Sequence, residues 1–165
     1  FELGIIRSHY VGRTFIEPSQ TIRQFGVKLK HSVNRSCIED KRVILIDDSI
    51  VRGTTASKIV KMVYEAGAKE VHLGISCPPI KHPDFYGIDT PNYNELIASK
   101  SNIEEMTELV GAKSLFFLSL DGTYKAMGYN ERNKELPQFT DHCFTGEYPI
   151  DISEILKINS YNASR

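Results

Sequence analysis

Hydrophobic and polar residues along this chain follow two patterns, short apolar runs and longer stretches with helical spacing. The run at residues 42–46 has no polar alternation, which is typical of a parallel strand covered on both faces, and residues 70–77 and 114–120 are further strand candidates. Between them, residues 55–67 and 101–111 carry apolar side chains at helical spacing, and each stretch ends at a glycine. This order predicts an α/β fold, a parallel sheet flanked by helices, with residues 42–46 as a central strand.

Local signals give further boundaries. Ser101 followed by Glu104 has the form of a capping box, so we expect a helix to begin there. Residues 1–6 resemble the end of a strand, whereas the irregular spacing over residues 7–35 predicts a long loop. A long loop within a compact domain is usually functional or disordered. Residues 150–165 are expected to form a loose tail with one short helix.

The composition is that of one soluble globular domain, with 41% hydrophobic and 25% charged residues among 165. No run of eighteen apolar residues, secretory signal or lipidation motif occurs, so we expect a cytoplasmic protein without membrane contact. Three cysteines lie far apart without a CxxC pattern, which predicts neither a disulfide framework nor a zinc site. The five histidines likewise show no metal-ligand spacing.

Charge is unevenly distributed although the net charge is only −1. Residues 7–42 hold eight Lys or Arg against three acids, whereas residues 84–121 hold two against seven. A basic front segment suits a small polyanionic ligand, although a solvated basic surface is about as common. Aromatic residues are not interleaved with the basic ones, so we do not expect nucleic acid as a partner.

The apolar run at 42–46 leads directly into Asp47 and Asp48, and then into a short loop that opens the helix from Thr55. Ligands of open α/β sheets bind at the carboxyl ends of the strands, and a helix N-terminus offers backbone N–H groups to phosphate. The two acids would reach sugar hydroxyls or a divalent cation. The loop has neither GxxxxGK[ST] nor GxGxxG, so the sequence predicts a sugar-phosphate site of another kind.

Residues 43–55, Val-Ile-Leu-Ile-Asp-Asp-Ser-Ile-Val-Arg-Gly-Thr-Thr, closely resemble the phosphoribosyl-pyrophosphate (PRPP) motif of type I phosphoribosyltransferases. Four further stretches are similar to one family of that superfamily, the glutamine PRPP amidotransferases: Tyr10–Ile16, Ala66–His72, Pro78–Ile80 and Phe85–Asp89. The resemblance extends over about residues 1–149, which implies a partial phosphoribosyltransferase domain followed by the tail.

In this family, ammonia attacks C1 of PRPP, pyrophosphate leaves, and phosphoribosylamine forms as the first step of purine synthesis. The resemblance implies that Asp47 and Asp48 take the ribose hydroxyls and Mg²⁺. It also implies a set of residues around the 5-phosphate, and these are Ser49, Arg52, Gly53, Thr54 and Thr55.

The resemblance further implies that residues 7–35 form a flexible lid, which closes over PRPP and channels ammonia. Arg13 and Lys30 would contact pyrophosphate, and Tyr10 would shape the lid. Arg7 stands where the family often has lysine, so it keeps the charge but not the geometry. Two alternatives are a non-catalytic module that senses PRPP or nucleotides, against which the lid motif Tyr10–Ile16 argues, and a base-salvage phosphoribosyltransferase, against which residues 85–89 and the long tail argue.

Departures from the family pattern are equally informative. Nothing in the chain corresponds to the N-terminal glutaminase domain with its cysteine nucleophile, or to the segment that carries the pyrophosphate loop. We therefore expect an N-terminally truncated domain, the C-terminal portion of the enzyme, with no glutamine-dependent and little or no ammonia-dependent activity.

An incomplete sheet would expose an edge or an apolar face, so we expect a homo-oligomer. The family also implies purine nucleotides as candidate inhibitors.

Some members of the family hold an iron–sulfur cluster with four cysteines. Cys143 matches one such position, but Asp84 occupies another, and Thr140 lies where the CxxC partner would be. One thiolate cannot hold a cluster, so we expect a colourless protein without iron.

Overall fold

The computed structural model describes residues 1–7, 31–90 and 92–155. Its main sheet is parallel and has the order β3-β4-β5, with β3 at Arg42–Asp47, β4 at Glu70–Ile75 and β5 at Ser114–Phe117. Two helices connect these strands, α3 at Thr54–Glu65 and α4 at Ile103–Val110. The predicted α/β architecture is confirmed.

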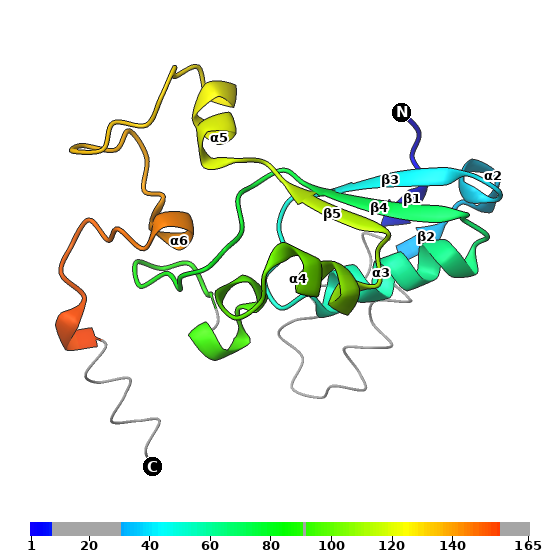
Figure 1. The fold of residues 1–165 in the computed structure, drawn as a ribbon, viewed down its shortest axis with the longest axis horizontal. Helices are drawn as coiled ribbons and strands as arrows, with labels where there is room; N and C mark the ends of the chain where they lie inside the picture. The colour runs from blue at the N-terminus through cyan, green and yellow to red at the C-terminus, as the bar shows by residue number, and fades with distance from the viewer. Residues whose placement is uncertain (8–30, 91, 156–165) are drawn as a thin grey trace, which may run out of the picture.

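The two connecting helices cover one face of the sheet, where they lie side by side (Figure 1). Helix α3 buries one stripe of side chains, as its helical spacing predicted, and α4 buries Met106 and Val110. These side chains pack on strand residues that are almost fully buried, including Val71 and Leu73 of β4. The hydrophobic core therefore lies between the sheet and this helical layer.

The prediction that residues 42–46 form a central strand covered on both faces is wrong for the described residues. Strand β3 lies at the edge of the main sheet, next to β4 alone. On the face away from the helices, the side chains of Ile44 and Ile46 are 64% and 65% exposed, and Phe116 of β5 is 48% exposed. The apolar run is continuous because both faces are apolar, but only one of them is covered.

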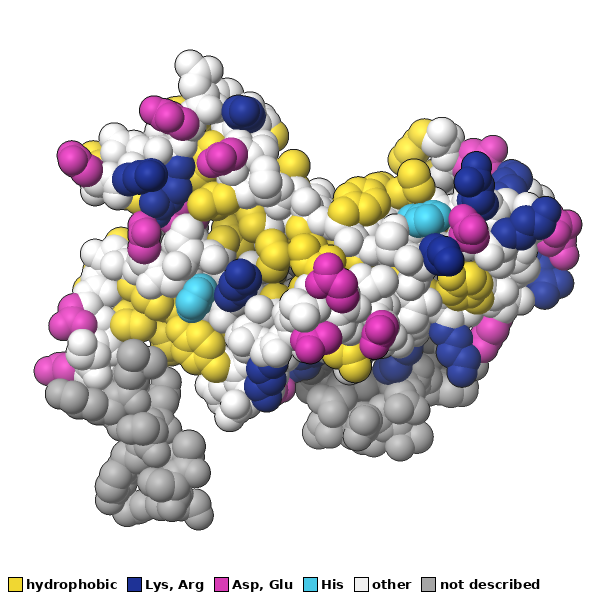
Figure 2. Space-filling view, viewed as in Figure 1, with side chains coloured by type: hydrophobic (Ala, Val, Ile, Leu, Met, Phe, Trp, Pro, Cys, Tyr) yellow, Lys and Arg dark blue, Asp and Glu magenta, His cyan; other side chains and the backbone are white. Residues whose placement is uncertain are grey.

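We call Ile44, Ile46 and Phe116 the bare sheet face. Gly74 of β4 lies between two of these residues, because a Cβ atom there would come within 2.6 Å of the Phe116 ring and 2.9 Å of Ile46 Cδ1. Figure 2 shows exposed hydrophobic side chains around the hollow between the two ends of the molecule. The expectation of an exposed apolar face is confirmed, whereas self-association through it stays a prediction.

A short antiparallel ribbon precedes the main sheet. Strand β1 (Ile5–Arg7) pairs with β2 (His31–Val33), and α2 (Arg35–Ile38) follows directly. The loop predicted over residues 7–35 is therefore wrong at both ends, because Arg7 lies in β1, residues 31–33 form β2, and Arg35 begins α2. The predicted lid residues Tyr10, Arg13 and Lys30 lie outside the described residues.

Helix α4 begins one residue later than predicted. The side chain of Asn102 accepts from the N–H of Glu105 at 2.9 Å, and the Glu105 carboxylate accepts from the Asn102 N–H at 2.9 Å. The capping box is therefore Asn102–Glu105, and not Ser101–Glu104. Two single turns precede this helix, η2 at Tyr93–Glu95 and η3 at Ile97–Ser99.

The chain after β5 builds the second end of the molecule. Strand β5 stops before the predicted residue 120, because the Ser119 side chain caps α5 (Leu120–Ala126) by accepting from the Gly122 N–H at 3.0 Å. An irregular segment then leads to α6 (His142–Thr145), which lies with α5 at the opposite end of the molecule from α2 (Figure 1). Of the predicted tail, residues 156–165 lie outside the described ranges. No helix within those ranges has the length and apolar character needed to cross a bilayer.

Candidate functional site: the loop between β3 and α3

The loop between β3 and α3 turns through a left-handed glycine. Gly53 has φ 76° and occupies the N-cap of α3, where it provides no side-chain cap. A side chain there would also collide with Ile97, since a Cβ atom would lie 2.9 Å from its Cδ1. The first N–H groups of a helix have no acceptor within the helix. The N-terminal turn of α3, starting with Thr54 and Thr55, is therefore suited to bind an anion.

The two acids lie at the opposite end of this loop, directly at the carboxyl end of β3. The carbonyl of Asp47 accepts from the Ser76 N–H at 3.0 Å and from its hydroxyl at 3.2 Å, which joins the ends of β3 and β4. The N–H of Asp48 donates to Asp47 Oδ1 at 3.0 Å, and Ser49 Oγ donates to Asp48 Oδ1 at 2.8 Å. The structure thus brings the predicted residues 47–49 together.

The pKa of a cysteine next to β4 is raised in part by the charges of these acids. The half-buried Cys77 follows Ser76, and its burial together with the negative charges of Asp48 and Asp47 raises the pKa of the thiol to about 11. Two carboxylates whose charges both affect Cys77 lie close enough together to attract one cation. Hard oxygen ligands of this kind suit Mg²⁺, so the residues present fit the ion that the resemblance implies.

Arg52 does not point toward the acids in this structure. Its Nε donates to Glu95 Oε2 at 2.7 Å, and both side chains are about half exposed. A backbone hydrogen bond holds the same two segments together, since the Ile97 N–H donates to the Val51 carbonyl at 3.0 Å. This ion pair connects the loop to turn η2, an arrangement that the sequence pattern did not reveal because Glu95 lies 43 residues away.

A hollow of about 500 Å³ opens beside the α3 N-terminus. Its walls include Arg52, Gly53 and Thr54 from the loop, and Glu95 and Lys100 from the segment before α4. Neither Asp47 nor Asp48 lines it. The hollow therefore borders the phosphate end of the loop without reaching the acids.

The remaining predicted site residues cannot be placed. Arg7 lies in β1, where only its backbone is described, and Tyr10, Arg13 and Lys30 lie outside the described residues. The structure therefore describes the predicted site residues of the 47–55 stretch, and among them Arg52 faces Glu95 rather than the acids.

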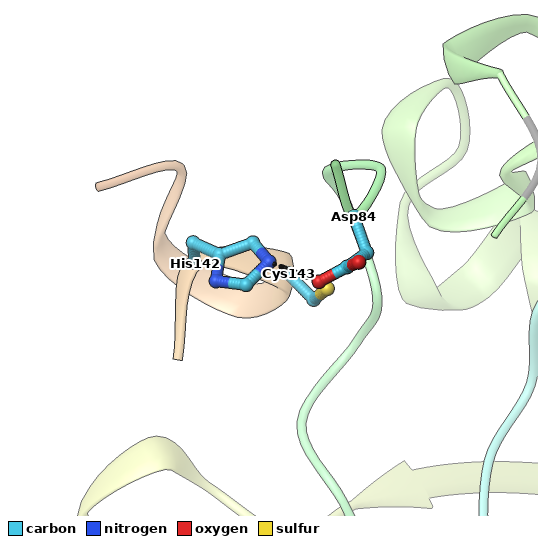
Figure 3. A group of neighbouring side chains, drawn as sticks. All are labelled: Asp84, His142 and Cys143. Atoms are coloured by element: carbon cyan, nitrogen blue, oxygen red, sulfur yellow. Dashed lines mark hydrogen bonds and ion pairs between the residues drawn. The ribbon is translucent and has the colours of Figure 1, made fainter. Parts of the chain in front are cut away.

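A second group of side chains lies away from this loop, and it joins His142 to Asp84 and Cys143, the two residues at cluster-ligand positions in the resemblance. Asp84, His142 and Cys143 converge between the loop after β4 and helix α6 (Figure 3). The histidines gave no signal because the carboxylate partner of His142 lies 58 residues earlier. These residues include one thiolate donor, so they do not fit the four-cysteine cluster of some family members.

Comparison with known proteins gives close relatives over nearly the whole chain. The amidophosphoribosyltransferase of Rhizobium etli is 63% identical over 150 residues, which are 90% of this chain and 30% of the relative. Amidophosphoribosyltransferase 1, chloroplastic, of Arabidopsis thaliana is 55% identical over 94% of this chain and 26% of its own length. No protein-family model matches the chain.

Solved structures agree with these relatives. The glutamine PRPP amidotransferase of Bacillus subtilis, complexed with ADP and GMP, is 52% identical with a TM-score of 0.78, covering 93% of this chain and 33% of that chain. The chain thus spans about a third of the length of the relatives it matches. With this identity and this fold, the homologues of this chain are amidophosphoribosyltransferases, and the chain matches the C-terminal portion of these proteins.

Proposed function

We propose that this chain binds PRPP with Mg²⁺ and forms the phosphoribosyl-transfer part of an amidophosphoribosyltransferase. That enzyme would make 5-phosphoribosylamine from PRPP and glutamine-derived ammonia, the first step of purine synthesis. The observation that carries the proposal is the β3–α3 connection, in which two adjacent acids and an uncapped helix N-terminus lie at the two ends of one loop.

The phosphate end of this loop would hold the 5-phosphate of PRPP. Thr54 and Thr55 have exposed side chains, and their hydroxyls and backbone N–H groups can donate to phosphate oxygens together with Gly53 and Ser49. Since Arg52 is paired with Glu95, its predicted phosphate contact requires that this exposed ion pair open. Exposed ion pairs contribute only about 0–1 kcal/mol, so a phosphate dianion can compete for the guanidinium.

The acid end of the loop would hold the ribose and the cation. Asp47 and Asp48 offer carboxylate oxygens to the ribose hydroxyls and to Mg²⁺, which when bound would offset the charge of the departing pyrophosphate. The reaction forms a C1–N bond, breaks the C1–O bond to pyrophosphate, and releases one proton from nitrogen. The role of the loop is to fix the sugar so that C1 faces the incoming ammonia.

Other parts of the proposal rest on the resemblance. Arg7, Tyr10, Arg13 and Lys30 would line the lid that excludes water from the reaction. Ammonia would come from a glutaminase domain, and homo-oligomer formation and a cytoplasmic location stay predictions. Because one related structure is a complex with ADP and GMP, we also propose purine nucleotides as inhibitors.

Calorimetric titration with PRPP and Mg²⁺ tests this function. We expect saturable binding to the wild-type chain and its loss in the double variant Asp47→Asn/Asp48→Asn. The matched control is Asp40→Asn, which removes a carboxylate before β3, and asparagine tolerates its left-handed backbone (φ 62°). Absence of wild-type binding, or equal loss in the control, would overturn the proposal.

A further inference from the structure

A cluster of three metal-binding side chain types lies away from the PRPP loop. Asp84 comes from the loop after β4, and His142 and Cys143 come from the single-turn helix α6 (Figure 3). One carboxylate oxygen, one imidazole nitrogen and the Cys143 sulfur all lie within 4.8 Å of one another. Ligands around a tetrahedral zinc ion are about 3.5 Å apart, so shifts of about 1.3 Å or less in the distances between these atoms would fit the group around an ion.

Two of the three side chains are almost completely removed from solvent. Asp84 is 2% exposed and His142 is 5% exposed, and His142 Nε2 is 2.7 Å from Asp84 Oδ2. The other carboxylate oxygen, Asp84 Oδ1, accepts from the backbone N–H groups of Tyr86 and Ile88, both at 2.8 Å. One oxygen is thus occupied in holding the loop, and the second faces α6.

The backbone holds the two segments together without help from the three side chains. The carbonyl of Cys143 accepts from the N–H groups of Lys81 and His82, at 2.9 and 3.1 Å. The position of Cys143 beside the 81–84 loop is therefore fixed by main-chain hydrogen bonds. An ion would find its three ligands already close, which lowers the ordering cost of binding.

Aromatic rings form an apolar wall around the imidazole. Tyr86 approaches the His142 ring edge-on at a centroid distance of 5.0 Å, and Tyr148 lies tilted at 5.1 Å. Such a wall limits access of water and strengthens electrostatic contacts inside it.

The hydrogen bonding of this pocket is incomplete. His142 Nδ1 is the one buried side-chain nitrogen or oxygen without a hydrogen-bond partner in the described residues. An unpartnered buried polar atom is unfavourable by about 1–3 kcal/mol, and native proteins contain few of them. His142 therefore makes its polar contact through Nε2 alone, and this is the ring nitrogen that faces Asp84 (Figure 3).

We propose that Asp84, His142 and Cys143 form a mononuclear site for a divalent transition metal ion of the zinc type. The mixed oxygen, nitrogen and sulfur donor set suits Zn²⁺ or Co²⁺, and the thiolate disfavours Mg²⁺ and Ca²⁺. A water molecule would take the fourth position. The bound ion would replace the direct contact between His142 and Asp84 and connect α6 to the 81–90 loop as a cross-link.

Cobalt titration of the metal-free full chain tests this site, because a thiolate ligand gives Co²⁺ a near-ultraviolet charge-transfer band. We expect one equivalent of Co²⁺ to bind, with that band and the visible bands of tetrahedral cobalt, and Zn²⁺ to displace it. Cys143→Ser should remove the charge-transfer band and weaken binding at least about tenfold. The matched control Cys77→Ser, which removes another half-buried thiol, should leave the spectrum unchanged.

Three results would overturn this proposal. The first is absence of stoichiometric Co²⁺ binding to the wild-type chain. The second is unchanged binding by Cys143→Ser, with thermal unfolding used to show that the variant is folded. The third is displacement of Co²⁺ by excess Mg²⁺, which would assign the ion to hard oxygen ligands such as Asp47 and Asp48.

Asp84→Asn keeps the shape of the side chain and should weaken binding while the backbone contacts stay.

Discussion

Arg132 holds Asp141 with two parallel hydrogen bonds, from Nε to Oδ2 at 2.6 Å and from Nη2 to Oδ1 at 3.1 Å. The two side chains are only 9% and 5% exposed. The hydroxyl of Tyr124 in α5 donates to the same carboxylate at 2.7 Å. Burial raises the pKa of Asp141, but the Arg132 and Tyr124 hydrogen bonds outweigh it and hold that pKa below its usual range. This pair closes the irregular segment between α5 and α6.

Arg132→Met should therefore be strongly destabilising. It would leave the Asp141 carboxylate buried without its cation, and breaking a buried pair in this way costs about 3–5 kcal/mol. Urea denaturation measures the change in free energy of unfolding. The control is Glu147→Gln, which removes the charge of the second partner of Arg132, at 2.6 Å, on a side chain that is 62% exposed. It should cost no more than about 1 kcal/mol, and a similar loss in both variants would contradict the interpretation.

Gly53→Ala should cost more stability than Gly111→Ala, although the two glycines have φ values of 76° and 75°. Both substitutions carry the cost of the left-handed backbone, about 1–2 kcal/mol. Only at Gly53 would the new Cβ also meet a neighbour, Ile97 Cδ1 at 2.9 Å, whereas nothing lies within 4 Å at Gly111.

The collision can be tested separately from the backbone strain. Ile97→Val removes the Cδ1 atom, so in that background Gly53→Ala should cost about as much as Gly111→Ala. Thermal or urea unfolding of the single and double variants gives the coupling. If Ile97→Val does not reduce the cost of Gly53→Ala, the overlap with Ile97 is not its cause.

Cys77 should become reactive only at high pH. Its thiol pKa is raised to about 11, so below that pH its alkylation rate should rise about tenfold per unit without levelling off near pH 9. Asp48→Asn removes one of the charges that raise this pKa, so it should lower the pKa and speed alkylation at pH 8. Iodoacetamide labelling followed by peptide mass spectrometry separates Cys77 from the other cysteines. A rate that levels off near pH 9 in the wild-type chain would argue against the raised pKa.

The raised pKa of Cys77 also makes the stability of the fold depend on pH. The folded-state pKa of Cys77 is raised above the unfolded value of 9.0, so its neutral form contributes stability that is complete below pH 9. That contribution is lost as the pH rises from about 9 to about 11. In Cys77→Ser this part of the alkaline loss should be absent.

Changes on the bare sheet face should alter association rather than folding. Ile44→Thr and Ile46→Thr keep β-branched residues on β3 but reduce the exposed apolar surface, so each should change stability by no more than about 0.5 kcal/mol. Sedimentation velocity should show less self-association. Leu136→Thr is the control, since Leu136 is 78% exposed but lies in the segment between α5 and α6. An unchanged sedimentation profile in the β3 variants would exclude this face as the contact.

Local patterns were sufficient for most of the main α/β unit. The spacing of apolar residues in α3 and α4 and the glycines that follow them depend on neighbours in sequence, so these elements were predicted from sequence alone. The adjacency of Asp47, Asp48 and the N-terminus of α3 follows equally from one short loop. The same stretch carried the resemblance to type I phosphoribosyltransferases, and four further stretches carried the resemblance to the amidotransferases.

Contacts between distant parts of the chain were decided only by the tertiary structure. Arg52 pairs with Glu95, and Asp84 contacts His142, although each pair is far apart in sequence. The face of β3 that is covered likewise depends on helices from other parts of the chain. An apolar run shows that both faces of a strand are hydrophobic, but not which face a helix will cover. The sequence by itself therefore determined the β3–α3 loop and the similarity to amidophosphoribosyltransferases, because both depend on short stretches of neighbouring residues. The bare sheet face and the three-residue cluster depend on which segments the fold brings together.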